Sequence, residues 1–248
     1  MSAELLTVRM LCIAANQPDV DIWRLGAVQA SIPIEFSALD AAAAAAHLLR
    51  GGVDVCVFDA QLPETERNRV IQAARAVDPQ PFLAAFAPRG LARVGGVDGV
   101  LPRPSNADEA RRVTELCVRV KIPTRVLIVD DSATMRSIVR KILSASRFAL
   151  DIHEANEGIA ALNQLRSGHF GMVFLDYNMP GLNGLETLSE IKRERPGTAV
   201  VMMTSTLDNA IADRAHAAGA HAFLKKPFYP ADIDAVLHRY FGMYMPMS

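Results

Sequence analysis

The sequence has few cysteines, almost no net charge and no long apolar run, and each shortage excludes a class of protein. Its three cysteines, Cys12, Cys56 and Cys117, are an odd number without metal-site spacing, so we expect reduced core residues rather than a disulfide framework. A formal net charge of −1 gives no electrostatic basis for binding nucleic acid or an anionic membrane. No segment approaches the roughly 20 apolar residues of a membrane span. We therefore expect a cytoplasmic protein whose partners are proteins or small ions.

Strand-like and helical patterns alternate along the second half of the chain. Half of the residues are hydrophobic, which is ample for a packed core. Apolar strand-like runs are found at 125–129, 150–153, 172–175, 199–203 and 222–224. Helical patterns lie at 133–146, 158–165, 185–192, 209–218 and 231–240. This alternation predicts an α/β fold with a doubly wound parallel sheet, whose ligand site lies at the carboxyl ends of the strands.

The first half repeats the same alternation in weaker form. Strand-like runs lie at 10–14, 34–37, 55–58, 81–86 and 99–101, and a helical pattern follows at 106–118. Asp59-Ala60-Gln61-Leu62-Pro63 resembles the later Asp176-Tyr177-Asn178-Met179-Pro180. The repeat predicts two domains, 1–121 and 122–248, joined by a short linker at 121–124.

Polar side chains stand where the strand-like runs of the second half end. The acidic pair Asp130-Asp131 follows the first run, and Asp176 follows the third. Thr204 and Lys226 follow the fourth and fifth runs. Crowded carboxylates repel one another unless a cation joins them, and Mg²⁺ prefers oxygen ligands. Asp176 can then act as a carboxylate nucleophile toward a phosphoryl group, with Lys226 and Thr204 beside it.

Each of these residues has an ordinary structural explanation when it is considered alone. A lone aspartate after a strand is a common turn former, and an acidic pair before a helix is a common N-cap. Single threonines and paired lysines at strand ends are commonly structural or solvated. The order and spacing of the whole set favour a site.

Residues 125–242 resemble a receiver domain of two-component signalling, in the style of the stand-alone chemotaxis (CheY-like) response regulators. The matching motifs are VLIVDDSATMR at 126–136, LDYNMPG at 175–181 and FLKKPF at 223–228. The resemblance implies a flavodoxin-like fold in which Asp176 accepts phosphate from a histidine kinase or a histidine phosphotransfer protein. The implied Mg²⁺ ligands are Asp130, Asp131, Asp176 and the backbone carbonyl of Asn178.

The resemblance also implies a switch. Lys226 holds the phosphate, and Thr204 and the aromatic Phe223 reorient together on phosphorylation. The chain shows no DNA-binding or cyclase segment after its last predicted helix. We therefore expect a response regulator that acts by binding a downstream protein and catalyses only its own phosphorylation and dephosphorylation.

The first half departs from the receiver pattern at the residues that carry chemistry. Alignment of strand ends puts Ala14 and Ala15 opposite the acidic pair, Phe86 opposite Thr204 and Arg103 opposite Lys226. The interval between Phe86 and Arg103 is short and rich in glycine, so we expect a stunted helix there. We interpret 1–121 as a degenerate receiver, either an interaction or homodimerisation platform or a shield for the second domain.

Two other functions stay open at this stage. A phosphorelay intermediate or phosphate sink would pass the phosphoryl group onward to a histidine phosphotransfer protein. A metal-dependent hydrolase of the haloacid dehalogenase type also uses an aspartyl nucleophile at a strand end. That class carries a second aspartate two residues onward, where this chain has Asn178.

Overall fold

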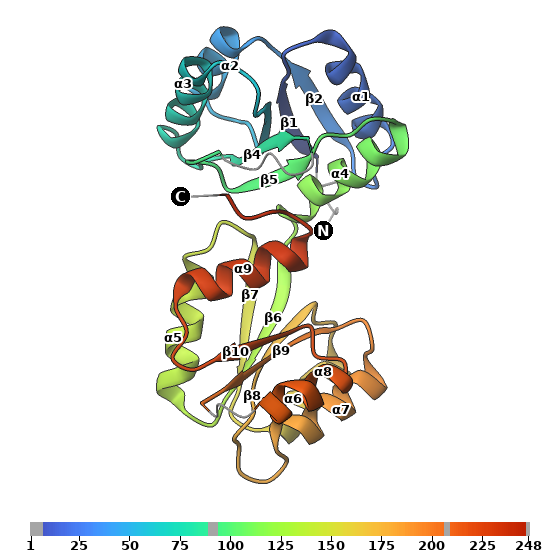
Figure 1. Cartoon of the computed structure of the whole chain (residues 1–248), viewed down its shortest axis with the longest axis vertical. Coiled ribbons are helices and arrows are strands. Elements are labelled where there is room, and N and C mark those ends of the chain that lie inside the picture. Colours follow the sequence, from blue (N-terminus) through green and yellow to red (C-terminus); the bar gives the residue numbers. More distant parts are fainter. Residues whose placement is uncertain (1–6, 89–93, 206–208, 247–248) are drawn as a thin grey trace, which may run out of the picture. The chain divides into compact units, whose positions relative to one another are not determined.

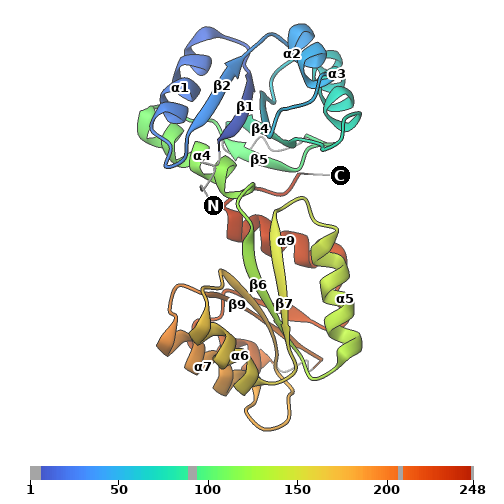
Figure 2. The ribbon, with the colours of Figure 1, turned by 180° about the vertical axis from the view of Figure 1, so that it is seen from behind.

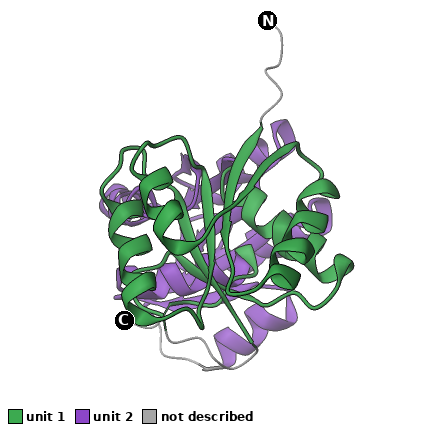
Figure 3. Cartoon of the chain, turned by 90° about the horizontal axis from the view of Figure 1, so that it is seen from above, with its two compact units in different colours: residues 1–121, 241–248 green, residues 122–240 purple. Residues whose placement is uncertain are grey.

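The computed structural model describes residues 7–88, 94–205 and 209–246, and it divides the chain into two compact units. Unit 1 comprises residues 1–121 together with 241–248, and unit 2 comprises residues 122–240 (Figure 3). The domain boundaries expected from the sequence differ in one respect, because they assigned 241–248 to the second domain.

Unit 1 is built on a parallel sheet with the strand order β2-β1-β3-β4-β5. Helix α1 packs against α4, and α2 packs against α3, so helices cover both faces of the sheet (Figures 1 and 2). The strands are β1 (Val8–Ile13), β2 (Ile34–Ala38), β3 (Val55–Asp59), β4 (Phe82–Ala87) and β5 (Gly99–Pro102). The helices among the described residues are α1 (Gln17–Val28), α2 (Ala41–Leu48), α3 (Glu64–Arg75) and α4 (Ala107–Arg119).

Local sequence accounts for these elements. Strands β3 and β4 are buried along their whole length, as expected for central strands of a parallel sheet covered on both faces. The side chains of Asn16, Asp40 and Asn106 each accept a backbone hydrogen bond from three residues onward and so cap α1, α2 and α4. The stunted helix expected from the sequence would lie between β4 and β5. The described residues of this connection, 88 and 94–98, form no helix, and residues 89–93 lie outside the described part of the chain.

Unit 2 repeats the architecture, with the strand order β7-β6-β8-β9-β10. Helices α5 and α9 lie on one face of the sheet, and α6, α7 and α8 lie on the other (Figure 1). The strands are β6 (Thr124–Val129), β7 (Leu150–Ala155), β8 (Met172–Asp176), β9 (Ala199–Thr204) and β10 (Ala222–Lys225). The helices are α5 (Ala133–Ser144), α6 (Gly158–Ser167), α7 (Gly184–Glu194), α8 (Asn209–Ala217) and α9 (Pro230–Phe241).

Both units therefore have the flavodoxin-like strand order in which the first strand lies between the second and the third. All strand pairs within the two sheets are parallel. This confirms the predicted fold class and directs the carboxyl ends of the strands of each sheet to one edge. Among the described residues, no helix is both long enough and apolar enough to cross a membrane.

The registers of the two sheets show which residues occupy equivalent positions. Asp59 pairs with Phe86 in unit 1, and Asp176 pairs with Met203 in unit 2. The counterpart of Thr204 is therefore Ala87, one residue beyond the Phe86 expected from the sequence. The sequence alignment ended the strand at Phe86, whereas β4 continues through Ala87.

The segment after α9 adds to the edge of the unit 1 sheet. Val100 of β5 and Tyr244 exchange two antiparallel backbone hydrogen bonds, each 2.9 Å long. Phe241 is fully buried, with the guanidinium of Arg119 5.8 Å from its ring centroid. Met243 is also buried. The burial of these apolar side chains explains why the segment belongs to unit 1.

Candidate functional site

The acidic pair lies in the turn between β6 and α5. Asp130 is 1% exposed, whereas Asp131 is exposed to solvent. One carboxylate oxygen of Asp130 accepts a 2.9 Å hydrogen bond from the backbone N–H of Ser132. Ser132 caps α5 by accepting from the backbone N–H of Met135. The tight turn and the cap therefore fix the carboxylate of Asp130 at the mouth of the sheet.

Asp176 is the last residue of β8 and is 4% exposed. The Nζ of Lys226 lies between the two buried carboxylates and donates to Asp130 Oδ2 at 2.8 Å and to Asp176 Oδ1 at 2.9 Å. Lys226 follows β10, and its backbone N–H donates to the carbonyl of Thr204 at 2.7 Å. The side chains expected at neighbouring strand ends therefore meet.

The three carboxylates form a compact cluster. Ligand atoms of Asp130, Asp131 and Asp176 lie within 4.8 Å of one another. Lys226 contributes one positive charge against three carboxylates, so negative charge remains in excess. A hard divalent cation with oxygen ligands suits this donor set. Asn178, whose backbone carbonyl was the fourth expected ligand, lies two residues after Asp176 in the same loop.

Burial and charge shift the protonation equilibria in the cluster. Burial raises the pKa of Asp176, and the negative charge of Asp130 raises it further, although the hydrogen bond from Lys226 acts in the opposite direction. Burial works to lower the pKa of Lys226, but its hydrogen bonds to Asp130 and Asp176 outweigh burial and raise it. Both pKa values are raised, because two buried carboxylates share the single ammonium of Lys226 and the cluster keeps an excess of negative charge.

The expected switch residues lie on the adjacent strands. Thr204 is fully buried and ends β9. Phe223 is half-buried on β10, where it packs against the core cluster of unit 2. Phe223 pairs with Met202 and Lys225 pairs with Thr204, so the aromatic ring stands two positions before the threonine along paired strands.

Arg136 braces the acidic turn, and Glu154 holds Arg136 in place. Arg136 on α5 donates from Nη1 to the backbone carbonyl of Asp130 at 2.8 Å, and its Nε donates to Glu154 at 3.0 Å. Hydrogen bonds first from Arg140 and then from Arg136 lower the pKa of Glu154. The position of Arg136, one helical turn after the N-cap, is the signal that points to this role.

Gly184 begins α7 close to the acceptor strand. A Cβ at this position would lie 2.4 Å from the backbone oxygen of Asp176 and 2.6 Å from the Cα of Tyr177. Only glycine allows this close approach. The start of α7 is therefore packed directly beneath the loop that carries Asp176.

A family model described as "Response regulator receiver domain" matches residues 126–238, which contain every residue of this site. The chemotaxis protein CheY-3 of Vibrio cholerae is 35% identical over 119 residues, covering 47% of this chain and 91% of that protein. The transcriptional regulatory protein ResD of Bacillus subtilis is 32% identical over 110 residues, covering 44% of this chain and 45% of that protein.

Some solved structures match nearly the whole chain. One of them is described as a "probable two-component system response regulator/GGDEF domain protein", and it covers 95% of this chain and 98% of its own, with a TM-score of 0.58. At 20% sequence identity this likeness shows the fold alone. The sequence match to CheY-3 carries the assignment, and the chain belongs to the response regulator receiver family of two-component signalling.

Proposed function

We propose that Asp176 accepts a phosphoryl group from a phosphohistidine on a histidine kinase or a histidine phosphotransfer protein. Phosphorylation then changes the affinity of unit 2 for a downstream protein. The observation that supports this most strongly is the position of Lys226 Nζ, 2.8 Å from Asp130 and 2.9 Å from Asp176. That ammonium can neutralise a phosphoryl oxygen on Asp176 without moving far.

The transfer is a substitution at phosphorus. A carboxylate oxygen of Asp176 attacks, the O–P bond forms, and the P–N bond to the histidine breaks, returning its electron pair to the imidazole nitrogen. Lys226 steadies the charge of the phosphoryl oxygens. The Asp130, Asp131 and Asp176 carboxylates, with the backbone carbonyl of Asn178, would hold Mg²⁺. When bound, the ion neutralises negative charge at the reacting oxygens.

Mass spectrometry after treatment with acetyl phosphate and Mg²⁺ tests the acceptor. We expect one phosphate on the peptide that contains Asp176 and none in the Asp176→Asn variant. Asp59→Asn is the matched control, and it should incorporate as much phosphate as the wild type. Undiminished phosphorylation of the Asp176→Asn variant would contradict the proposal.

The switch part of the proposal depends on Thr204 and Phe223. A phosphoryl group on Asp176 attracts the Thr204 hydroxyl. The Phe223 ring then moves into the space that the threonine leaves, and this movement alters the surface formed by α8, β10 and α9. A Thr204→Ala variant should accept phosphate but bind the downstream partner no more tightly afterwards. Partner binding that responds to phosphate as in the wild type would refute the coupling.

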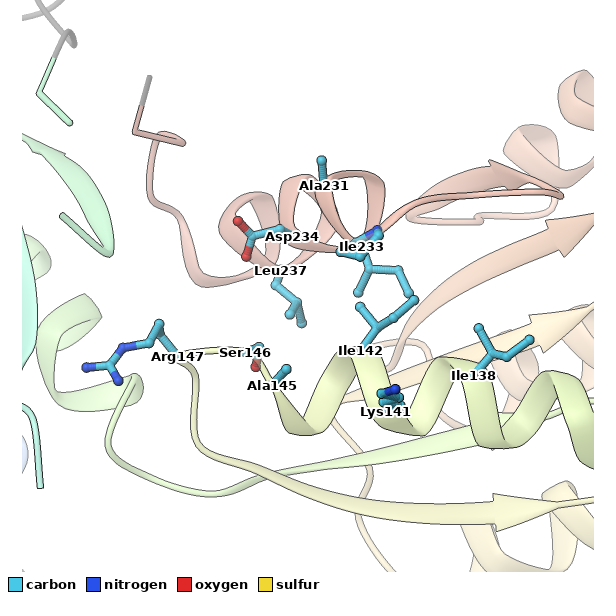
Figure 4. A pocket seen from close by; sticks show the side chains of 11 residues that line it. Ile138, Lys141, Ile142, Ala145, Ser146, Arg147, Ala231, Ile233, Asp234 and Leu237 are labelled. Atoms are coloured by element: carbon cyan, nitrogen blue, oxygen red, sulfur yellow. The ribbon is translucent and has the colours of Figure 1, made fainter. Parts of the chain in front are cut away.

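We also propose that the groove between α5 and α9 receives a helix of the phosphodonor. The groove has a volume of about 570 Å³, and the apolar side chains of Ile142, Ile233 and Leu237 project into it (Figure 4). Helix α5 begins just after the acidic pair, and α9 begins four residues after Lys226, so both walls start at the acceptor site. An apolar groove of this kind accepts an amphipathic helix.

Two exposed isoleucines provide a matched test of docking. Ile138 lines the groove and is 43% exposed, whereas Ile159 lies on α6, on the opposite face, and is 58% exposed. Ile138→Ser should slow phosphoryl transfer from a phosphorylated histidine phosphotransfer protein but leave labelling by acetyl phosphate unchanged. Ile159→Ser should affect neither rate. Equal protein-donor rates in the two variants would remove the groove from the proposal.

A phosphorelay uses the same site but predicts a different fate for the phosphate. Rapid return of phosphate from Asp176 to a histidine protein would favour a relay or a phosphate sink over a switch. Measuring that reverse transfer, beside partner binding with and without phosphate, separates the two functions. Steady turnover of a small phosphate ester would instead indicate a hydrolase.

A further inference from the structure

The strand-end pocket of unit 1 is equivalent to the acceptor site of unit 2 but holds different groups. Asp59 ends β3 as Asp176 ends β8. Ala14 and Ala15 follow β1 where the acidic pair follows β6, and Ala87 replaces Thr204. Two of the three clustered carboxylates and the switch hydroxyl of unit 2 therefore have no counterpart in this pocket.

Arg103 occupies the position of Lys226. Its backbone N–H donates to the carbonyl of Ala87 at 2.8 Å, as that of Lys226 does to Thr204. Its guanidinium donates from Nη2 to Asp59 Oδ1 at 2.5 Å and from Nη1 to Asp19 Oδ2 at 2.7 Å. The side chain of Arg103 therefore bridges two carboxylates with two separate N–H groups.

The second carboxylate comes from a helix rather than from a strand end. Asp19 lies in the first turn of α1, where its backbone N–H donates to the Asn16 side chain and its carboxylate accepts from Asn16 Nδ2 at 2.8 Å. Asp19 is itself buried. The bonds to Asn16 hold its carboxylate toward the strand ends, and it restores one of the two negative charges that Ala14 and Ala15 lack.

Neither oxygen of Asp59 is available for attack on phosphorus. Oδ1 accepts from Arg103 and from the backbone N–H of Gln61 at 2.9 Å. Oδ2 is buried and has no hydrogen-bond partner among the described residues. The whole residue is 1% exposed. A phosphoryl donor would have to displace a guanidinium that is covalently tethered to β5.

We propose that Arg103 is a built-in cation that fills the acceptor pocket of unit 1, so that unit 1 keeps one conformation with or without Mg²⁺ and a phosphodonor. In unit 2 the excess of negative charge leaves room for an exchangeable cation. In unit 1 Asp59 and Asp19 share one tethered guanidinium, which leaves one uncompensated negative charge where unit 2 has two, and Ala87 offers no hydroxyl to move. Unit 1 therefore presents a constant surface, and the switch operates in unit 2 alone.

The single tryptophan of the chain reports on this pocket. Trp23 on α1 is fully buried, and its ring centroid lies 5.4 Å from that of Phe86. The guanidinium carbon of Arg103 lies 5.4 Å from the same Phe86 ring. Binding of an ion or a phosphoryl group at Asp59 would displace Arg103 and change the environment of Trp23.

The first experiment uses the full chain with Asp176→Asn, so that unit 2 accepts no phosphate. Addition of Mg²⁺ and beryllofluoride should leave Trp23 emission unchanged, and acetyl phosphate should leave Asp59 unmodified by mass spectrometry. A change in emission or a phosphate on Asp59 would overturn the proposal. Because unit 2 is disabled, failure here is distinguishable from failure of the function proposed for Asp176.

A second experiment measures the bridge itself. Asp59→Asn should lower the unfolding temperature followed by Trp23 emission by about 5–10 °C, because the half-buried guanidinium of Arg103 loses one charged partner. Arg103→Gln should also lower it, and the double variant should lose less than the sum of the two single losses. An unchanged unfolding temperature for Asp59→Asn, or strictly additive losses, would refute the bridge. If the single variants do not fold, the Trp23 and mass-spectrometric results on Asp176→Asn remain decisive.

Discussion

Replacement of Asp176 by asparagine should stabilise unit 2 in the absence of divalent cations. Ligand atoms of Asp176 and Asp130 lie within 4.8 Å, so their repulsion is about 3.5 kcal/mol at an effective dielectric constant of 20. The exposed Asp131 adds about 1 kcal/mol at the dielectric constant of water, and attraction to Lys226 at 2.9 Å returns about 6 kcal/mol. Burial of the Asp176 carboxylate costs several kcal/mol more. With the burial cost taken as about 3.5 kcal/mol, the ionised form of Asp176 is disfavoured by about 2 kcal/mol.

The raised pKa of Asp176 agrees in direction with this penalty on the ionised form, because a raised pKa means that the folded protein prefers the neutral carboxyl. A folded-state pKa above the unfolded value gives stability that is full below the unfolded pKa and is lost as the pH rises through the folded pKa. At neutral pH the wild type has lost this contribution, whereas the neutral asparagine never titrates. The variant should therefore unfold about 4–8 °C higher than the wild type in EDTA.

Mg²⁺ should reduce or cancel this advantage. A ligand at 100 times its Kd stabilises the protein that binds it by about 2.7 kcal/mol, and the variant lacks one of the carboxylate ligands. The assay is thermal unfolding followed by circular dichroism, with Trp23 emission recorded in parallel to identify the transition of unit 1. A variant that is less stable than the wild type in EDTA, or a difference that Mg²⁺ does not change, would refute the reasoning.

Two further predictions concern residues outside the carboxylate cluster. Gly184→Ala should destabilise unit 2 by about 1–3 kcal/mol in urea unfolding, because the new Cβ would meet backbone atoms of the acceptor loop. Gly197→Ala is the control and should cost far less, because a Cβ at Gly197 meets nothing within 4 Å. Equal losses of stability in the two variants would argue against close packing at the start of α7. Burial lowers the pKa of His221 below 6.5, and the charges of Arg239 and Lys192 lower it further. The folded protein therefore favours a neutral His221, and the stability that this adds is full above pH 6.5 and is lost as the pH falls through the folded pKa. His221→Phe should therefore lose less stability than the wild type between pH 8 and pH 5.5 in urea titrations, and an identical loss would contradict this assignment.

The sequence predicted the strand-end cluster because parallel strands place their carboxyl ends at one edge. Once the strand-like runs were assigned, Asp130, Asp176 and Lys226 had to meet, and they do. The type and order of the elements also followed from apolar periodicity, which reflects burial on both faces of the sheets.

Other contacts depend on tertiary packing and left no comparable signal. Asp19 sits in the first turn of a helix, where an acidic residue is an ordinary dipole partner, and only the packing of α1 shows that it reaches Arg103. The one-residue error at Phe86 arose because an apolar run does not mark the residue at which strand pairing stops. The position of residues 241–246 depends on the slot that Phe241 and Met243 fill, which is assembled from α4 and β5.

The chain passes between the two units twice, once after Lys121 and again after Tyr240. Unit 2 is therefore connected as an inserted domain is, with both of its ends covalently attached to unit 1. A single cut at residue 121 separates neither unit cleanly. The fragment 122–248 would carry Phe241 and Met243 without the slot that buries them, and the fragment 1–121 would expose the edge of β5 that Tyr244 covers. To separate the two units, the chain must be cut after residue 121 and again after residue 240, and residues 241–248 must stay with residues 1–121.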